Sequence, residues 1–185
     1  MAAGGSPGNV DVGPGRLYYA ALGTAEPTDC STVLPSANWK VLGYTAAGPT
    51  FSFTQTVQPV DVAEELDPIA FLNTQRETKV IVELVEMTRA RLALSLGGGV
   101  TIDSTGAFTP PVAGTEVSVM LVWDKLDTVS ATNTRYLFRN ARPSGALAIK
   151  RQKAPNKASL PVEFLCAKTN LGESFTLFPG TLFLA

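Results

Sequence analysis

Hydrophobic and polar residues alternate in short runs along most of the chain. Because successive side chains of a strand point to opposite faces, this period of two predicts β-strands with at least one buried face. The clearest runs are residues 16–22, 39–44, 51–57, 78–86, 116–124, 135–142, 160–166 and 175–184. A short hairpin over residues 100–109 and a segment at 145–149 bring the expected total to about nine or ten strands.

Several of these runs are apolar on both faces. In residues 78–86, Val80, Val82 and Leu84 share one face, and the opposite face is only half polar. A strand of this kind needs a covering layer on each side, which either its own chain or a second copy can supply.

One segment departs from the strand period. Residues 87–96 repeat at about 100° per residue, which predicts a short helix ended by the three glycines 97–99. Its apolar side chains fall on two sides, with Met87, Ala90, Ala93 and Leu94 on one and Leu92 and Leu96 on the other. Such a helix needs two packing partners. The sheet is one, and the other is either the rest of the core or a neighbouring chain.

One helix among many short strands predicts a mainly β fold, a β-sandwich or rolled barrel with one flanking helix. Residues 1–15 are rich in Gly and Pro and predict a flexible N-terminal arm, so residues 16–185 are expected to form a single domain. Within that domain, residues 46–77 contain three prolines, and residues 59–77 lack a clear period. We therefore expect a long loop at about 46–77.

Composition favours self-association. Of the 185 residues, 45% are hydrophobic and only 17% are charged, whereas about 25% is usual for a soluble domain. The net charge of −1 gives no overall basic bias toward nucleic acid. No apolar run is long enough to span a bilayer, and the N-terminus lacks the order of a signal peptide. We expect the chain to remain in a cytoplasm, where Cys30 and Cys166 would stay free thiols, although a bridge between them is left open.

Catalytic chemistry is poorly supported, because the chain has no histidine and so no Ser-His-Asp triad or imidazole zinc site. One compact acidic group consists of Asp61, Glu64, Glu65 and Asp67. Its spacing fits neither a calcium loop nor a readable glycosidase pair, and an enzyme built on Glu64 and Asp67 is strongly disfavoured. A solvated turn or an interface patch is favoured. We predict no catalytic residue, no metal site and no cofactor.

A compact basic group consists of Lys150, Arg151, Lys153 and Lys157. It has no interleaved aromatic residue, which favours a solvated turn or an acidic partner chain over nucleic acid. Since both charged groups lie in turn-like segments, we expect some of the acids to meet some of the bases across subunits.

The order of several segments along the chain is characteristic. In sequence they read GPGRLYYAALGTAEP, WKVLGYTAAGPTFSFTQTVQPVDVAEELDPI, MTRARLALSLGGG and KAPNKASLPVEFLCAK. In this order they resemble the major tail protein, or tail tube protein, of long-tailed, siphovirus-like phages of actinobacteria. The resemblance covers nearly the whole chain beyond the N-terminal arm.

This resemblance implies a β-sandwich subunit with one flanking helix. It implies homohexameric rings that stack into a tube, with a lumen through which viral DNA passes into the host, and with the segment at about 46–77 reaching the adjacent ring. Implied partners are the chain itself, a tape-measure protein, and tail terminator and distal tail proteins, with no membrane partner. The implied location is the virion tail, assembled in the host cytoplasm.

A β-sandwich module that binds a ligand or carbohydrate is the alternative. Such a module usually displays an exposed aromatic platform. Trp39 and Trp123 both lie within strand alternation, where a core position is favoured.

Overall fold

The computed structural model describes residues 15–61, 66–98, 101–102, 105–109, 111–112, 114–126, 133–144, 149, 158–170 and 172–179. Its elements are β1 (Gly15–Ala21), β2 (Lys40–Val41), β3 (Thr50–Val60), β4 (Ala70–Leu84), α1 (Arg89–Ser95), β5 (Thr101–Ile102), β6 (Phe108–Thr109), β7 (Val119–Leu126), β8 (Asn133–Ser144), β9 (Leu160–Cys166) and β10 (Phe175–Phe178). The fold is mainly β, as predicted, and every strand pair in it is antiparallel.

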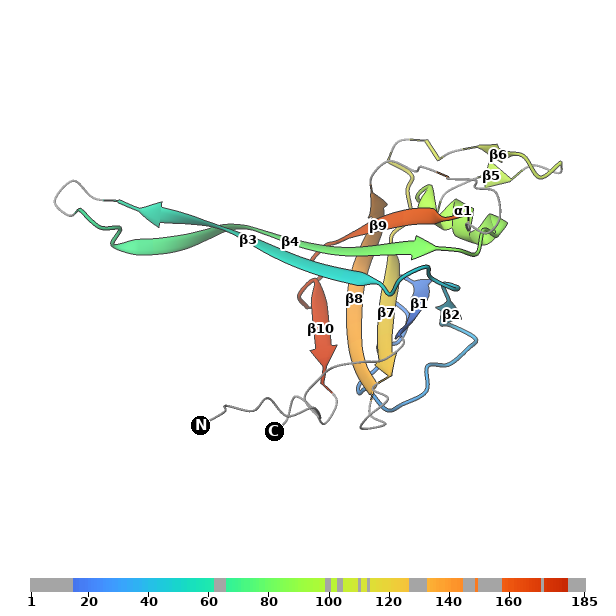
Figure 1. Cartoon of the computed structure of the whole chain (residues 1–185), viewed down its shortest axis with the longest axis horizontal. Helices are drawn as coiled ribbons and strands as arrows, with labels where there is room; N and C mark the ends of the chain where they lie inside the picture. The colour runs from blue at the N-terminus through green and yellow to red at the C-terminus, as the bar shows by residue number, and fades with distance from the viewer. Residues whose placement is uncertain are drawn as a thin grey trace, which may run out of the picture.

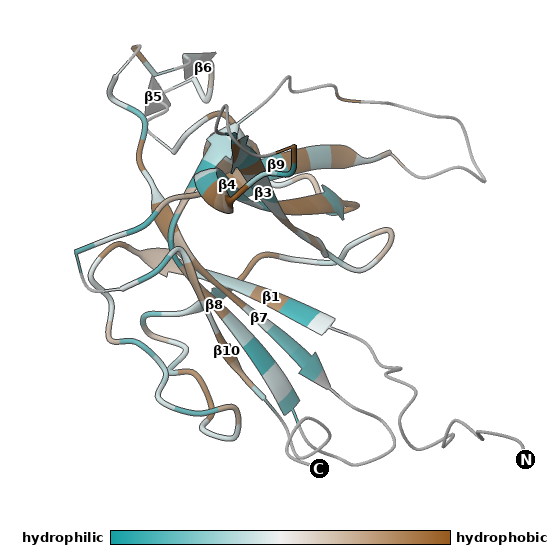
Figure 2. Ribbon diagram, turned by 90° about the vertical axis from the view of Figure 1, so that its left-hand side faces the viewer, coloured by the Kyte–Doolittle hydropathy of each residue, from teal (hydrophilic) through white to brown (hydrophobic). Residues whose placement is uncertain are grey.

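Strand β8 joins the two layers of the molecule. The sheet order is β2-β1-β7-β8-β9-β4-β3, with β10 also paired to β8. The first part of β8 pairs with β7 and β10, and its last residues, Ala141 to Ser144, pair with β9. Figures 1 and 2 show the result: β1, β7, β8 and β10 form one layer, and β3, β4 and β9 cross it as a second.

The main core lies between these layers. Its buried side chains are Leu17, Leu42, Val80, Val82, Leu84, Leu94, Val119, Leu121, Phe138, Ala141, Leu160, Val162 and Phe164. The predicted inward faces of residues 78–86 and 160–166 both lie in this cluster, which confirms them. Burial of each Val, Leu or Phe side chain in this cluster contributes about 1.5–3 kcal/mol.

A second cluster covers the opposite face of β1, β7 and β8. It consists of Ala20, Trp39, Met120, Val122 and Leu137. Segment 22–39, which has no strand or helix, lies over this face, and its last residue, Trp39, is only 3% exposed. The chain itself therefore covers the second apolar face of these strands. The prediction of an interior Trp39 is confirmed, although the residue precedes β2 and does not lie in a strand.

The helix is shorter than residues 87–96 but lies where it was predicted. Thr88 is its N-cap and accepts a hydrogen bond from the Arg91 amide at 3.4 Å. Gly97 and Gly98 follow it at positive φ of 101° and 75°, a conformation that glycine adopts at little cost. Both amides donate to carbonyls of the last turn, Leu94 and Ala93.

The predicted packing residues of the helix differ in burial. Leu94 is buried at 7% exposure, and Leu92 packs against the same core. Met87 is 38% exposed, Ala90 is exposed and Leu96 is half-buried. Within the described chain, α1 therefore packs on the core through Leu92 and Leu94, one from each predicted apolar side, and leaves Met87 and Ala90 exposed. No described helix is of the length and hydropathy that crossing a membrane would require.

The expected loop at about 46–77 is wrong as secondary structure. Most of that range belongs to a long hairpin formed by β3 and β4, which pair from Thr50–Ile81 to Val60–Ala70 with a register shift at Thr56/Val57. Most side chains of this hairpin are exposed. Because neither face of its outer part is buried, no alternation of apolar and polar residues is required there. Pro59 is compatible with β3 because β3 lies at the edge of the sheet.

Candidate functional site

The most distinctive surface of the molecule is the outer part of the β3–β4 hairpin, residues 54–60 and 70–77, here called the hairpin arm. Strand β4 pairs with β9 only from Thr78 to Leu84. Beyond that point, β3 and β4 pair only with each other. Figure 1 shows the arm projecting far from the two layers of the body.

Apolar side chains lie exposed along the arm and beside its turn. They are Val57 (48% exposed), Leu66 (105%), Ile69 (58%), Phe71 (68%) and Leu72 (58%). Pro59 is the cross-strand partner of Phe71, and Gln58 is that of Leu72. Since cross-strand partners share a face and neighbours alternate, Phe71 and Leu72 point to opposite faces. The arm thus presents apolar groups on both sides, as an element does when it is buried in an assembly.

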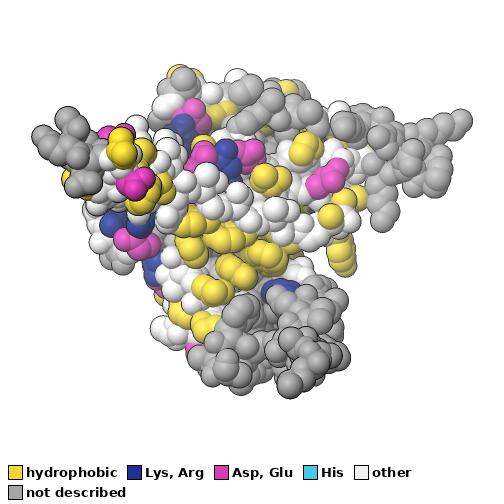
Figure 3. Space-filling view, turned by 60° about the vertical axis from the view of Figure 1, so that its left-hand side comes forward, with side chains coloured by type: hydrophobic (Ala, Val, Ile, Leu, Met, Phe, Trp, Pro, Cys, Tyr) yellow, Lys and Arg dark blue, Asp and Glu magenta, His cyan; other side chains and the backbone are white. Residues whose placement is uncertain are grey.

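The base of the arm is fixed to the body by aromatic contacts. The ring of Phe175 in β10 lies 5.0 Å from Phe51 and 5.5 Å from Phe53, both with edge-on geometry. Beside it, the hydroxyl groups of Thr78 and Ser174 are hydrogen-bonded at 2.9 Å. In Figure 3, hydrophobic side chains gather on the face of the body from which the arm leaves.

The two charged groups predicted from the sequence are only partly covered by the structure. Asp61 follows β3 and Asp67 precedes β4, so the two flank the turn of the hairpin and both are exposed. The other members lie outside the described residues: Glu64, Glu65, Lys150, Arg151, Lys153 and Lys157. A contact between the acidic and basic groups across subunits stays a prediction.

The sheet ends in free edges. Strands β2 and β3 are the two ends of the strand order, so the outer edges of Lys40–Val41 and of Thr50–Val60 have no strand partner in the described chain. A long free edge presents unpaired backbone groups to any strand that can approach it. Sequence reasoning did not find this feature, because pairing order cannot be read from periodicity.

The described residues show no arrangement typical of catalysis. Among them, no group of three or more His, Cys, Asp and Glu is placed to hold a metal ion. Both cysteines are free, and burial raises the pKa of the Cys166 thiol to about 12, so it carries almost no thiolate near neutral pH. Trp123 stacks on Tyr136 at 4.9 Å, packed against the core, and forms no exposed platform.

Comparison with known proteins places the chain in a family. The family model described as "Phage tail tube protein" matches residues 8–174. A search of curated proteins found no match. Among solved structures, the chain is similar to one in the cryo-EM structure of the six-fold symmetrised baseplate of the anti-feeding prophage, with 10% identity and a TM-score of 0.49, over 96% of this chain and 97% of that one. On the family match, which spans most of its length, this chain belongs to the phage tail tube protein family and is a structural component of a phage tail.

Proposed function

We propose that this chain is a tube subunit whose copies form six-membered rings, and that these rings stack around a lumen through which viral DNA passes into the host. Its role in the tail is structural, without catalysis. The observation that carries the proposal is the hairpin arm, which projects from the body and has no strand partner beyond its own hairpin among the described residues.

An unsupported arm of this kind is costly in water. Isolated two-stranded hairpins are only marginally stable, and this one also exposes Phe71 and Leu72. Packing against another copy would bury both faces and hold the strands together. The arm therefore supports contacts between copies, with the neighbouring ring as the place that the family resemblance implies.

The free edges of the sheet support closed rings. A single subunit leaves the outer edge of β3 and that of β2 without a strand partner in the described chain. Ring closure would cover such edges in every copy, whereas a monomer leaves them open to uncontrolled pairing.

The other features proposed here follow from the resemblance. They are an origin in a siphovirus-like phage of actinobacteria, assembly in the host cytoplasm, and contacts with a tape-measure protein, a tail terminator and distal tail proteins. The passage of DNA would be transient and non-specific. The net charge of −1 is compatible with a lumen that does not retain phosphate backbones.

The test compares two variants by sedimentation velocity across a range of concentrations. The double variant Phe71→Ser, Leu72→Ser removes apolar groups from both faces of the arm. Val33→Ser is the control, because Val33 is also exposed, at 86%, but lies in segment 22–39. We expect wild type and control to form rings or tubes, and the arm variant to remain a folded monomer. Equal assembly of all three would contradict a role for the arm, and a wild type that stays monomeric would contradict the proposed function.

A further inference from the structure

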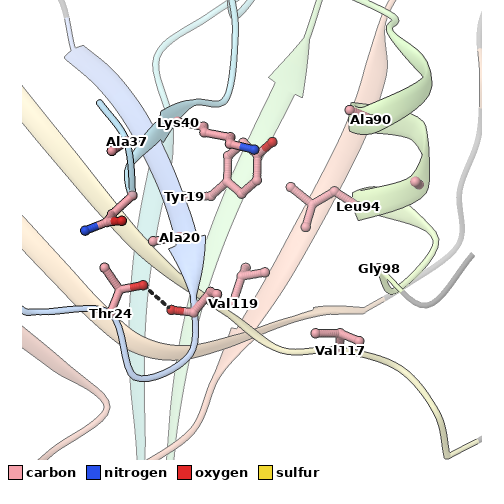
Figure 4. Close-up of a pocket in the computed structure, with 13 residues that line it drawn as sticks. Tyr19, Ala20, Thr24, Ala37, Lys40, Ala90, Leu94, Gly98, Val117 and Val119 are labelled. Atoms are coloured by element: carbon pink, nitrogen blue, oxygen red, sulfur yellow. Dashed lines mark hydrogen bonds between the residues drawn. The ribbon is translucent and has the colours of Figure 1, made fainter. Parts of the chain in front are cut away.

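A groove separates the β1–β2 edge of the sheet from α1. It has a volume of about 480 Å³, and its walls include Tyr19, Lys40, Ala90, Leu94, Gly98 and Val119. Figure 4 shows Tyr19 and Lys40 on the strand side, with Ala90 and Leu94 facing them from the helix. Tyr19 and Lys40 are cross-strand partners and so share a face. We call this hollow the helix-edge groove.

The groove opens directly onto the main core. Leu94 and Val119 line it, and both are core side chains exposed by only 7%. Small residues, including Ala90, Ala93 and Gly98, form much of the remaining wall. An apolar side chain that entered here would extend the existing core without displacing a large group, which is the packing that interiors favour.

The groove and the hairpin arm lie at opposite ends of the molecule. Along the long axis in Figure 1, the arm projects at one end, and α1, β1 and β2 lie toward the other. The arm of a chain therefore cannot reach its own groove. A second copy placed head-to-tail can bring its arm there, and such a contact repeats from copy to copy.

The charges at the end of the hairpin arm and at the helix-edge groove are opposite in sign. Lys40 stands at the groove and forms no ion pair with the described residues. Asp61 and Asp67 flank the turn at the end of the arm and likewise have no described partner. An arm end seated in the groove would bring opposite charges together beside the apolar contact, which favours one orientation over others.

We infer that the helix-edge groove receives the end of the hairpin arm from a second copy of this chain, with Phe71, the more exposed of the two large arm side chains, inserted and Asp67 near Lys40. This inference rests on the proposed function and names the receiving surface. It would also cover Ala90 of α1, which is exposed among the described residues.

The first experiment fills the groove. Ala90 is exposed, so Ala90→Trp should leave the fold intact while occupying the space, and Ala90→Ser is the matched control that leaves it open. We expect the tryptophan variant to raise the protein concentration required for assembly by roughly tenfold or more, because the affinity of each contact between copies would fall by about a factor of ten. The serine variant should assemble like wild type.

The second experiment exchanges the charges. Lys40→Glu and Asp67→Lys should each weaken assembly, and the double variant should recover most of the loss, because it restores an opposite pair in the reversed sense. Additive losses in the double variant would overturn the placement of Asp67 near Lys40.

A cross-link locates the contact directly. The background carries Cys30→Ser and Cys166→Ala and must assemble like wild type. In the test variant, Phe71→Cys is combined with Ala90→Cys. In the control variant, Phe71→Cys is combined with Val33→Cys. Oxidation of tubes should link the first pair between chains and not the second. The groove assignment would be overturned if the Ala90→Trp variant forms tubes normally and if no disulfide forms between the cysteines at positions 71 and 90. That outcome would leave the proposed function standing. A wild-type chain that never assembles would overturn both.

Discussion

Arg135 holds segment 22–39 against the sheet. Its guanidinium is 2% exposed and pairs with Asp124, with Nη2 donating to Oδ2 at 2.8 Å. Its Nη1 donates to the carbonyls of Asp29 and Thr32 at 2.8 and 3.0 Å. The Asp29 carboxylate accepts from the Thr32 and Ser31 amides, which lowers its pKa to about 2. One buried cation therefore links β7, β8 and the segment that covers the second core cluster.

Arg135→Met should be strongly destabilising. The change leaves Asp124 and two carbonyls without their partner, and breaking a buried ion pair from one side costs about 3–5 kcal/mol. Urea unfolding followed by tryptophan fluorescence measures it. Arg142→Met is the control, because Arg142 lies on the same strand and pairs with Glu116 but is 52% exposed. Equal loss of stability in both variants would contradict the structural role given to Arg135.

At the scale of elements, the hairpin is divided into a fixed base and an unsupported arm. Phe53, at the base, packs edge-on against Phe175 in β10. Phe71, in the arm, is 68% exposed. The same strand pair thus contributes to monomer stability in one half and is available for contacts between copies in the other.

Two alanine substitutions should separate these halves. Phe53→Ala should lower the free energy of unfolding of the monomer by about 1–2 kcal/mol, through lost burial and a lost aromatic contact. Phe71→Ala should change it by no more than about 0.5 kcal/mol but impair assembly. Denaturation of dilute monomer gives the free energy of unfolding, and light scattering of concentrated protein measures assembly. A destabilised Phe71→Ala monomer would show that the arm packs on its own body.

How much could be predicted from the sequence also differs by element. The buried face of β9 was predictable because Leu160, Val162 and Phe164 alternate with more exposed residues, and the predicted bounds of this strand match the observed ones. Of the arm, only residues 54–57 were predicted as strand, within the run 51–57, and the rest was not predictable because side chains exposed on both faces obey no burial pattern. The helix-edge groove was not predictable either, since Tyr19, Ala90 and Val119 meet only through the fold and carry no chemical signature.

At the scale of the whole molecule, the hairpin arm and the helix-edge groove are complementary surfaces. The arm projects at one end and the helix-edge groove opens toward the other, while free strands end the sheet order. The single chain leaves all of these exposed among its described residues, and the proposed closed ring, stacked on its neighbours, would cover them. The low charge fraction of 17% fits a surface that is largely buried in an assembly.

Electron microscopy of the purified wild-type chain at high concentration tests this account most directly. We predict hollow tubes whose end-on views average to six-fold rings with an open lumen, because each copy would meet its neighbours through the same repeated surfaces. Isolated monomers at every concentration and salt condition, or filaments without a lumen, would contradict it.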